Sequence, residues 1–210
     1  MQEPFNEVIA TAIMKRLGVY HVPYTIAFEK AAPYSLCENF VGVDTEFIPA
    51  WRVVQSVKRR NNDPEFTHLL RCCDVLGIGD CTGEVDRMLT VDYIIANEDR
   101  HYNNFGFLRN PDTLEWLGFA PVFDGGTSLW FNTLRVGGET ECKPFRKTHE
   151  EQIKLVGDLS WFDLGVLDGF EGECDSILLG SSLVDFERRN VIVAAVLKRI
   201  DYVEMAKIVG

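Results

Sequence analysis

The stretch "NEDRHYNNFGF", residues 97–107, gathers Asp99, Arg100, His101 and the pair Asn103–Asn104 into one short polar cluster. An apolar stretch with helical spacing precedes it, and an apolar, aromatic stretch typical of a strand follows it. A solvated turn needs only one or two such polar residues. The cluster is therefore either an unusually polar loop or a reaction centre, and the residues around it decide between the two.

A hairpin is predicted directly after the cluster, within residues 104–126. Two apolar, aromatic segments flank Asn-Pro-Asp-Thr at 110–113, which are residues that favour turns. The second segment ends in "FDGG", where the acid is Asp124. The chain thus runs through helix, polar loop, strand, turn, strand and Asp-Gly-Gly, with Asp99 and Asn104 at the two ends of the loop.

Kinases arrange their catalytic groups in this order. In that pattern Asp99 orients or deprotonates the attacking hydroxyl, and Asn104 and Asp124 hold Mg²⁺ or Mn²⁺ between the phosphates of ATP. The oxygen donors suit such a cation. Asn103 is an alternative ligand whose spacing is one residue short. Each of these side chains also has an ordinary interpretation as a residue that caps or bonds a turn, and Arg100 is expected to pair with a nearby acid.

The segment "EDRHYNN" resembles the D-R-H-x-x-N loop of phosphatidylinositol-kinase-like enzymes and, more closely, of HipA-type bacterial serine/threonine kinases. Three other segments are similar to that family: "NEVIATAIMKRLGVYHVPYTIAF" (6–28), "SLCENF" (35–40) and "PVFDGGTSLW" (121–130). The resemblance covers roughly residues 3–130. It implies an α+β fold that is mainly a kinase-like C-lobe, with the hairpin described above beside the catalytic loop.

The same resemblance implies a single domain over residues 1–210. Residues 1–50 would form a helix-plus-strands remnant of the N-lobe together with the nucleotide hinge, and residues 51–210 would form the C-lobe. Glu38 and Phe40 would offer backbone groups to adenine. Glu7, with Glu3 as its rival, would pair with the nucleotide-binding Lys, although a first-turn Glu is also favoured by the helix dipole alone. His101 would hold the geometry of the catalytic loop.

One departure from the family concerns the start of the sequence. HipA-type kinases carry a glycine-rich phosphate loop and the nucleotide Lys ahead of the first helix, whereas the sequence here starts at that helix, and Lys15 lies within it. We therefore expect weak ATP binding and impaired phosphoryl transfer unless that segment is supplied. A half-domain would also expose apolar surface, so self-association is expected.

Composition limits the classes of partner, the cysteine chemistry and the location that can be expected for the protein. The 210 residues carry a formal net charge of −11, which disfavours direct binding of nucleic acid or of an anionic membrane. The basic triplet at 58–60 is expected to be a solvated helix end. The six cysteines contain no C-x-x-C pair, and no signal peptide or membrane span is evident. We expect a cytoplasmic protein with free thiols.

Periodicity and turn residues predict the other elements. Helices are expected at 4–17, 51–60, 64–76, 84–96 and 184–204. Strands are expected at 22–29 and 35–41, around a turn at Ala31-Ala32-Pro33. Short helical pieces are expected within the Gly-, Ser- and acid-rich stretch 139–181.

Three functions remain open at this point. The first is phosphoryl transfer from ATP to a Ser or Thr hydroxyl of a protein. The second is a non-catalytic kinase-like module that binds a protein partner, by analogy with the antitoxins that accompany HipA-type enzymes. The third is a metal-dependent phosphoesterase, which would hydrolyse its substrate and select adenine poorly.

Overall fold

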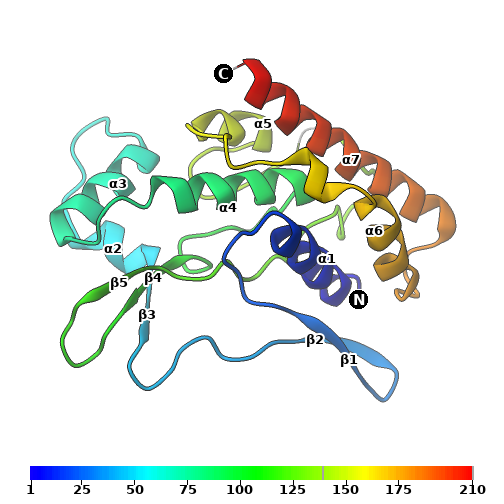
Figure 1. Cartoon of the computed structure of the whole chain (residues 1–210), viewed down its shortest axis with the longest axis horizontal. Helices are drawn as coiled ribbons and strands as arrows, with labels where there is room; N and C mark the ends of the chain where they lie inside the picture. Colours follow the sequence, from blue (N-terminus) through cyan, green and yellow to red (C-terminus); the bar gives the residue numbers. More distant parts are fainter. Residues whose placement is uncertain (139, 210) are drawn as a thin grey trace.

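The computed structural model describes residues 1–138 and 140–209, and its architecture is α+β (Figure 1). Glu139, at the start of the Gly- and Ser-rich stretch, and Gly210 lie outside the described residues. The described chain contains seven α-helices: α1 (Glu3–Arg16), α2 (Ala50–Ser56), α3 (Glu65–Leu76), α4 (Thr82–Ile95), α5 (His149–Gln152), α6 (Phe170–Leu179) and α7 (Phe186–Val209). Two 3-10 helices lie at Ile153–Leu155 and Leu164–Leu167. The expected mainly helical α+β architecture is confirmed at this level.

Helix α4 runs through the centre of the body, between α1 on one side and α7 on the other (Figure 1). Ten of its fourteen residues are buried, so it is apolar on nearly all sides, as a core helix must be. Two of those buried residues, Asp86 and Asp92, are acids and need partners in the interior. The helix ends at Ala96, immediately before the polar loop, and so fixes where that loop starts.

A three-stranded antiparallel sheet lies beyond the polar loop. Its strands are β3 (Glu46–Pro49), β4 (Gly106–Arg109) and β5 (Trp116–Phe119), in the order β3-β4-β5. The β4–β5 hairpin was expected, but β3 was not, because its only partner lies about sixty residues away in sequence. A Cβ on Gly106 would meet the carbonyl oxygen of Ile48 at 2.3 Å, so a glycine lets β3 approach.

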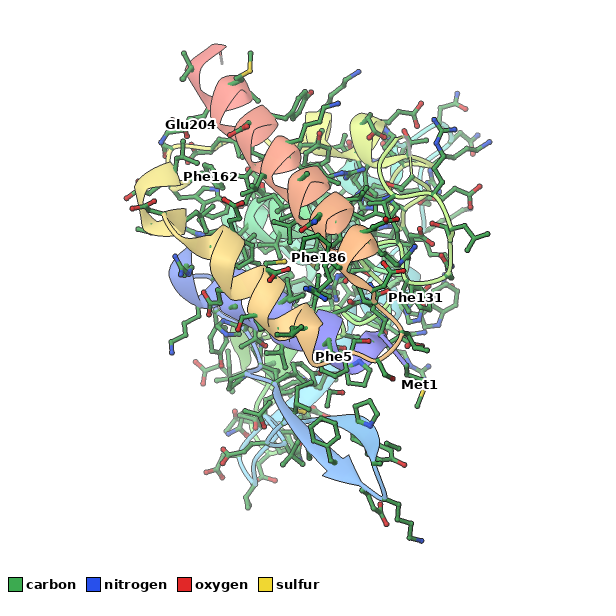
Figure 2. All side chains as sticks on the ribbon, turned by 90° about the vertical axis from the view of Figure 1, so that its right-hand side faces the viewer. Met1, Phe5, Phe131, Phe162, Phe186 and Glu204 are labelled. Carbon is green, nitrogen blue, oxygen red and sulfur yellow. The ribbon has the colours of Figure 1, made fainter. Side chains whose placement is uncertain are left out.

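The second sheet is the β1 (Thr25–Glu29) and β2 (Ala32–Leu36) hairpin, which stands away from the helical body (Figure 2). The hairpin was expected, but its turn and its length were placed wrongly. The turn falls at Lys30–Ala31, both with positive φ, and Pro33 lies inside β2, where a sheet edge tolerates it. Residues 37–42 are not a strand, because their would-be partner Val22 bonds Val122 instead.

The expected helices at 4–17, 64–76, 84–96 and 184–204 are confirmed to within a few residues, and the last extends to Val209. The helix expected at 51–60 ends earlier, at Ser56, because Val57 already has extended backbone angles. Within the described ranges, none of the helices combines the length and apolar character that a membrane crossing requires.

Candidate active site

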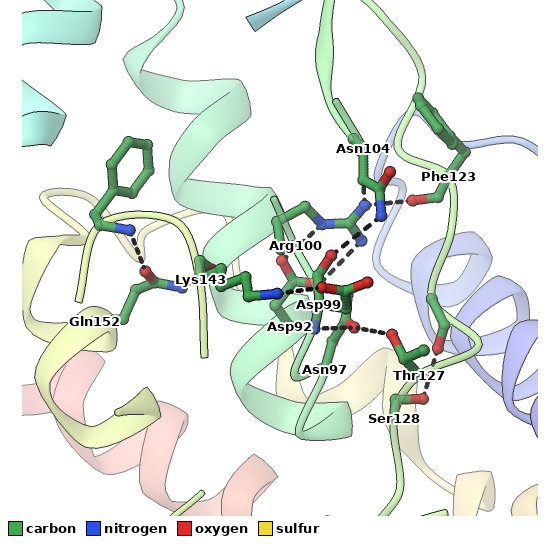
Figure 3. Close-up of polar contacts among 12 residues, drawn as sticks. Asp92, Asn97, Asp99, Arg100, Asn104, Phe123, Thr127, Ser128, Lys143 and Gln152 are labelled. Carbon is green, nitrogen blue, oxygen red and sulfur yellow. Dashed lines mark hydrogen bonds and ion pairs between the residues drawn. The ribbon is translucent and has the colours of Figure 1, made fainter. Parts of the chain in front are cut away.

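A buried ion pair joins the polar loop to helix α4. The guanidinium of Arg100 is 1% exposed and donates from Nε to Asp92 Oδ2 at 2.9 Å and from Nη2 to Oδ1 at 3.0 Å (Figure 3). Asn97 Nδ2 donates to the same carboxylate at 2.9 Å. Burial lowers the pKa of Arg100, but the charge and hydrogen bonds of Asp92 outweigh it and hold the pKa above its ordinary value. The pair anchors the loop rather than taking part in chemistry at the surface.

The same guanidinium also links the loop to the segment after β5. Its Nη1 donates to the carbonyl oxygen of Asn104 at 2.8 Å and, through a short hydrogen bond, to the carbonyl oxygen of Phe123 (Figure 3). One nitrogen thus holds the backbone of Asn104 and the backbone of Phe123, the residue before Asp124. The segments that carry the two residues expected to share a cation therefore meet at one guanidinium.

The loop folds tightly around the carbonyl oxygen of Asp99. That oxygen accepts hydrogen bonds from the backbone N–H of His101 at 2.7 Å and from Asn104 Nδ2 at 3.1 Å. Because the amide nitrogen of Asn104 is engaged in this way, its amide oxygen is the atom left to bind a ligand. Asn103, the alternative, is exposed on the outside of the loop.

The carboxylate of Asp99 is at the open face of the site and is 36% exposed. Its Oδ1 lies 2.6 Å from Lys143 Nζ, and its Oδ2 lies 3.8 Å from His101 Nε2. His101, which was expected to hold the geometry of the loop, also accepts a hydrogen bond from the backbone N–H of Asn103 at Nδ1, at 3.3 Å. Lys143 was not expected: it belongs to the irregular stretch after residue 139, and no motif or spacing relates it to Asp99.

Asp124 adopts a left-handed backbone conformation with φ of 58°, and Ala96, at the start of the loop, has φ of 53°. Such angles are strained for residues other than glycine and concentrate at functional sites. Burial raises the pKa of the Asp124 carboxyl, the charge of Arg100 lowers it, and the charge of Asp99 raises it. Within residues 1–138 and 140–209, no side chain or backbone N–H donates a hydrogen bond to the Asp124 carboxylate, so its oxygens can accept a ligand there.

Helix α1 rests on the Asp-Gly-Gly segment. Glu7 Oε2 accepts a hydrogen bond from the backbone N–H of Gly125 at 2.9 Å. A Cβ at Gly125 would lie 2.9 Å from the Cβ of Ala10, so the glycine permits this close approach. Asn6 adds hydrogen bonds from Nδ2 to the carbonyl oxygens of Gly126 and Ser128. Of the two glutamates considered from the sequence, Glu7 rather than Glu3 therefore faces the site.

The pH dependence of stability should report on Glu7. Burial raises its pKa from 4.5 to about 7, with Asp124 adding to the rise. Because the folded pKa is the higher one, the folded state holds the proton more tightly, and stability falls as pH rises from 4.5 to 7. We expect this group to lower the free energy of unfolding by up to about 3 kcal/mol over that window. Glu7→Gln should remove that part of the slope in urea titrations at pH 5 and pH 8.

Glu3→Gln, one turn earlier on the same helix, is the matched control and should leave the slope unchanged. An identical pH slope in the Glu7→Gln variant and the wild type would contradict the prediction.

The two residues expected at a nucleotide hinge are placed differently from each other. Phe40 packs against Phe47 and Phe123, with ring centroids 5.6 and 5.4 Å away, and so lies beside the segment that carries Asp124. Glu38 is exposed in the irregular connection after β2, and no side-chain contact is recorded for it. The aromatic trio forms a half-buried apolar surface at the edge of the site.

In the described part of the chain, no three His, Cys, Asp or Glu side chains lie close enough together to form a metal site by themselves. The oxygens available at the site are those of Asp99, Asn104 and Asp124. They are hard donors of the kind that Mg²⁺ and Mn²⁺ prefer, and Mg²⁺ usually completes its shell with water and substrate phosphates. The donor set fits such a cation.

Comparison with known proteins gives a fold but no sequence family: no family model and no curated protein matches the chain. Among solved structures, the chain is similar to the Helicobacter pylori proinflammatory kinase CtkA, with a TM-score of 0.69, 16% identity, and coverage of 99% of this chain and 88% of that one. It is also similar to a chain of the Shewanella oneidensis MR-1 toxin–antitoxin complex of HipA, HipB and operator DNA. That match has a TM-score of 0.56 and 12% identity, and it covers 97% of this chain but only 57% of the other. The chain thus has a kinase-like fold of the HipA kind.

Proposed function

We propose that this chain transfers a phosphoryl group from ATP to a Ser or Thr hydroxyl of a protein. The observation that supports the proposal is the double contact of Arg100 Nη1 with the carbonyl oxygens of Asn104 and of Phe123, the residue before Asp124. The kinase-like fold supports it. The division into an N-lobe remnant with hinge (1–50) and a C-lobe (51–210) belongs to the same proposal.

Each residue has a role that its position suits. Asp99, exposed at the open face, would orient the acceptor hydroxyl and take its proton. The amide oxygen of Asn104 and the carboxylate of Asp124 would hold Mg²⁺ or Mn²⁺. Such a cation, when bound, supplies charge neutralisation for the phosphates. His101 would help to hold the loop around Asp99.

The nucleotide would lie against the segment that contains Glu38 and Phe40. Phe40, with Phe47 and Phe123, offers an apolar surface for adenine, while the backbone of residues 38–40 offers hydrogen bonds. Glu7 would pair with a nucleotide-binding Lys. Its high pKa fits a carboxylate that needs such a cation, because a nearby positive charge would favour the ionised form.

Calorimetric titration with Mn²⁺ and a non-hydrolysable ATP analogue tests the cation site. Asp124→Asn should weaken Mn²⁺-dependent binding of the analogue at least about tenfold, since even supporting contacts of metal ligands are worth that much. Because burial raises the pKa of Asp124, protons compete with the cation, and the affinity should fall as the pH is lowered.

Asp112→Asn, in the exposed turn of the same hairpin, is the matched control for that titration. Equal Mn²⁺ responses in the wild type and the Asp124→Asn variant would refute the assignment of the cation site.

A protein partner is part of the proposal, because one structural neighbour was solved as a complex of HipA with HipB and DNA. The β1–β2 hairpin presents Phe28, Tyr34 and Leu36 to solvent, each about half exposed or more, and is the surface we propose for a partner or for self-association. The same titrations separate the other two functions. A non-catalytic module would bind no ATP analogue, and a phosphoesterase would bind adenine and guanine nucleotides alike.

A further inference from the structure

We propose that Lys143 is a second catalytic residue, which contacts the transferred phosphoryl group beside Asp99. This inference rests on the proposed kinase function. Its starting point is the 2.6 Å contact between Lys143 Nζ and Asp99 Oδ1, at the open face of the site. An exposed ion pair contributes little to stability, so the contact alone does not show a role. The way the backbone of Lys143 is held provides the second argument.

A buried glutamine fixes the segment that carries Lys143. Gln152 is 2% exposed, and its Nε2 donates to the carbonyl oxygen of Lys143 at 2.8 Å. Its Oε1 accepts from the backbone N–H of Phe145 at 3.0 Å and of Arg146 at 3.2 Å (Figure 3 shows part of this arrangement). Three hydrogen bonds from one interior side chain set the conformation of this exposed turn, and a flexible surface loop would not need them.

The same segment is packed directly on the catalytic loop. The ring of Phe145 is buried and lies 5.9 Å from that of Tyr102 and 6.3 Å from that of Phe105, centroid to centroid. Phe66 of helix α3 closes the cluster at 5.2 Å. Lys143 is therefore two residues away from Phe145, the apolar side chain that anchors this segment on the loop of Asp99. This anchor holds the ammonium group of Lys143 at the carboxylate of Asp99.

The charged side chains around the site leave the transferred phosphate in need of a positively charged side chain. Arg100 is fully engaged with Asp92 and two carbonyl oxygens, so its charge is not free to meet a phosphate. The carboxylate of Asp124 would repel a triphosphate. Of the two described side chains paired with Asp99, His101 and Lys143, it is Lys143 that ends in an ammonium group with three N–H donors.

An ammonium group has three N–H donors, and one of them suffices for Asp99. The other two N–H donors can reach oxygens of the phosphoryl group during its transfer. In the transfer step the proton of the acceptor hydroxyl passes to Asp99, the hydroxyl oxygen forms a bond to the γ-phosphorus, and the bond from that phosphorus to the bridging oxygen breaks, leaving ADP with the electron pair. Lys143 would stabilise the charge on the three equatorial oxygens.

The test compares Lys143→Met with Lys147→Met, which changes an exposed lysine four residues further along the same segment. The assay is transfer of ³²P from labelled ATP to a library of Ser- and Thr-containing peptides. Lys143→Met should lower kcat about 10²–10³-fold, the effect of removing one donor to transition-state charge. Its affinity for ATP should fall more than its affinity for ADP. Lys143→Arg should restore part of kcat, and Lys147→Met should behave as wild type.

Calorimetry with nucleotide separates the two possible failures. A wild-type chain that binds neither ATP nor ADP would overturn the kinase function and this inference with it. If the wild type binds ATP and transfers phosphate, but Lys143→Met matches Lys147→Met, the role of Lys143 alone is wrong. A faster Lys143→Met variant would also overturn it and would show that Lys143 blocks Asp99 instead.

Discussion

Replacing Asp99 by Asn is expected to lower the rate of phosphoryl transfer by about 10²–10⁴-fold, the usual contribution of a positioned acid or base. The amide keeps the shape of the side chain but cannot accept the proton of the acceptor hydroxyl. Binding of ATP should change little, since Asp99 faces the acceptor rather than the nucleotide. The loss should therefore fall on kcat, measured as ³²P transfer to the peptide library described above.

Asp112→Asn, which removes an acid from the exposed hairpin turn, should transfer at the wild-type rate. An Asp99→Asn variant as fast as the wild type would show that transfer uses another base. The absolute rate of the wild-type chain tests a separate expectation drawn from the sequence, namely that transfer is slow.

Replacing Arg100 by Met should have the largest effect on stability. The change leaves the carboxylate of Asp92 buried without its cation and removes the donor shared by Asn104 and Phe123. Breaking a buried ion pair from one side costs about 3–5 kcal/mol. Urea denaturation followed by circular dichroism measures the free energy of unfolding.

The matched control is Arg109→Met, whose pair with Glu46 is partly exposed and should cost about 0–1 kcal/mol. Removing both charges, in an Asp92→Leu/Arg100→Met double variant, should destabilise less than the two single changes added together, because neither charge is then left unpaired. Additive effects would mean that the two side chains do not act as a pair.

Local pattern accounts for the parts of the fold that could be predicted. Helix α4 follows a segment with the turn-forming residues Gly77, Gly79 and Asp80 and contains mainly apolar residues, and the loop after it is recognisable by its polar residues. Even the partner of Arg100 left a signal: Asp92 falls in the apolar register of residues 84–96, and an acid in a buried stripe requires a buried cation or donor.

Strand β3 and Lys143 could not be predicted, for a common physical reason. The residues Glu46–Pro49 become a strand only because β4 pairs with them, and β4 is distant in sequence. Lys143 reaches Asp99 only because Gln152 and Phe145 hold its backbone on the catalytic loop. Nothing near Lys143 in the sequence distinguishes it from Lys147. Contacts between segments that are distant in sequence determine both strand β3 and the position of Lys143. Local propensity does not predict such contacts.

The attachment of α1 to the Asp-Gly-Gly segment has a consequence for how the protein is made. Asn6 bonds the carbonyl oxygens of Gly126 and Ser128, and Gln2 bonds that of Leu129, across 120 to 127 residues of chain. A ribosome adding 5–20 residues per second needs roughly 6–24 s to supply those partners. Helix α1 thus cannot make these contacts until well after its own residues have been synthesised. During those seconds the apolar face of α1, with Ile9 and Ile13, is not covered by this segment.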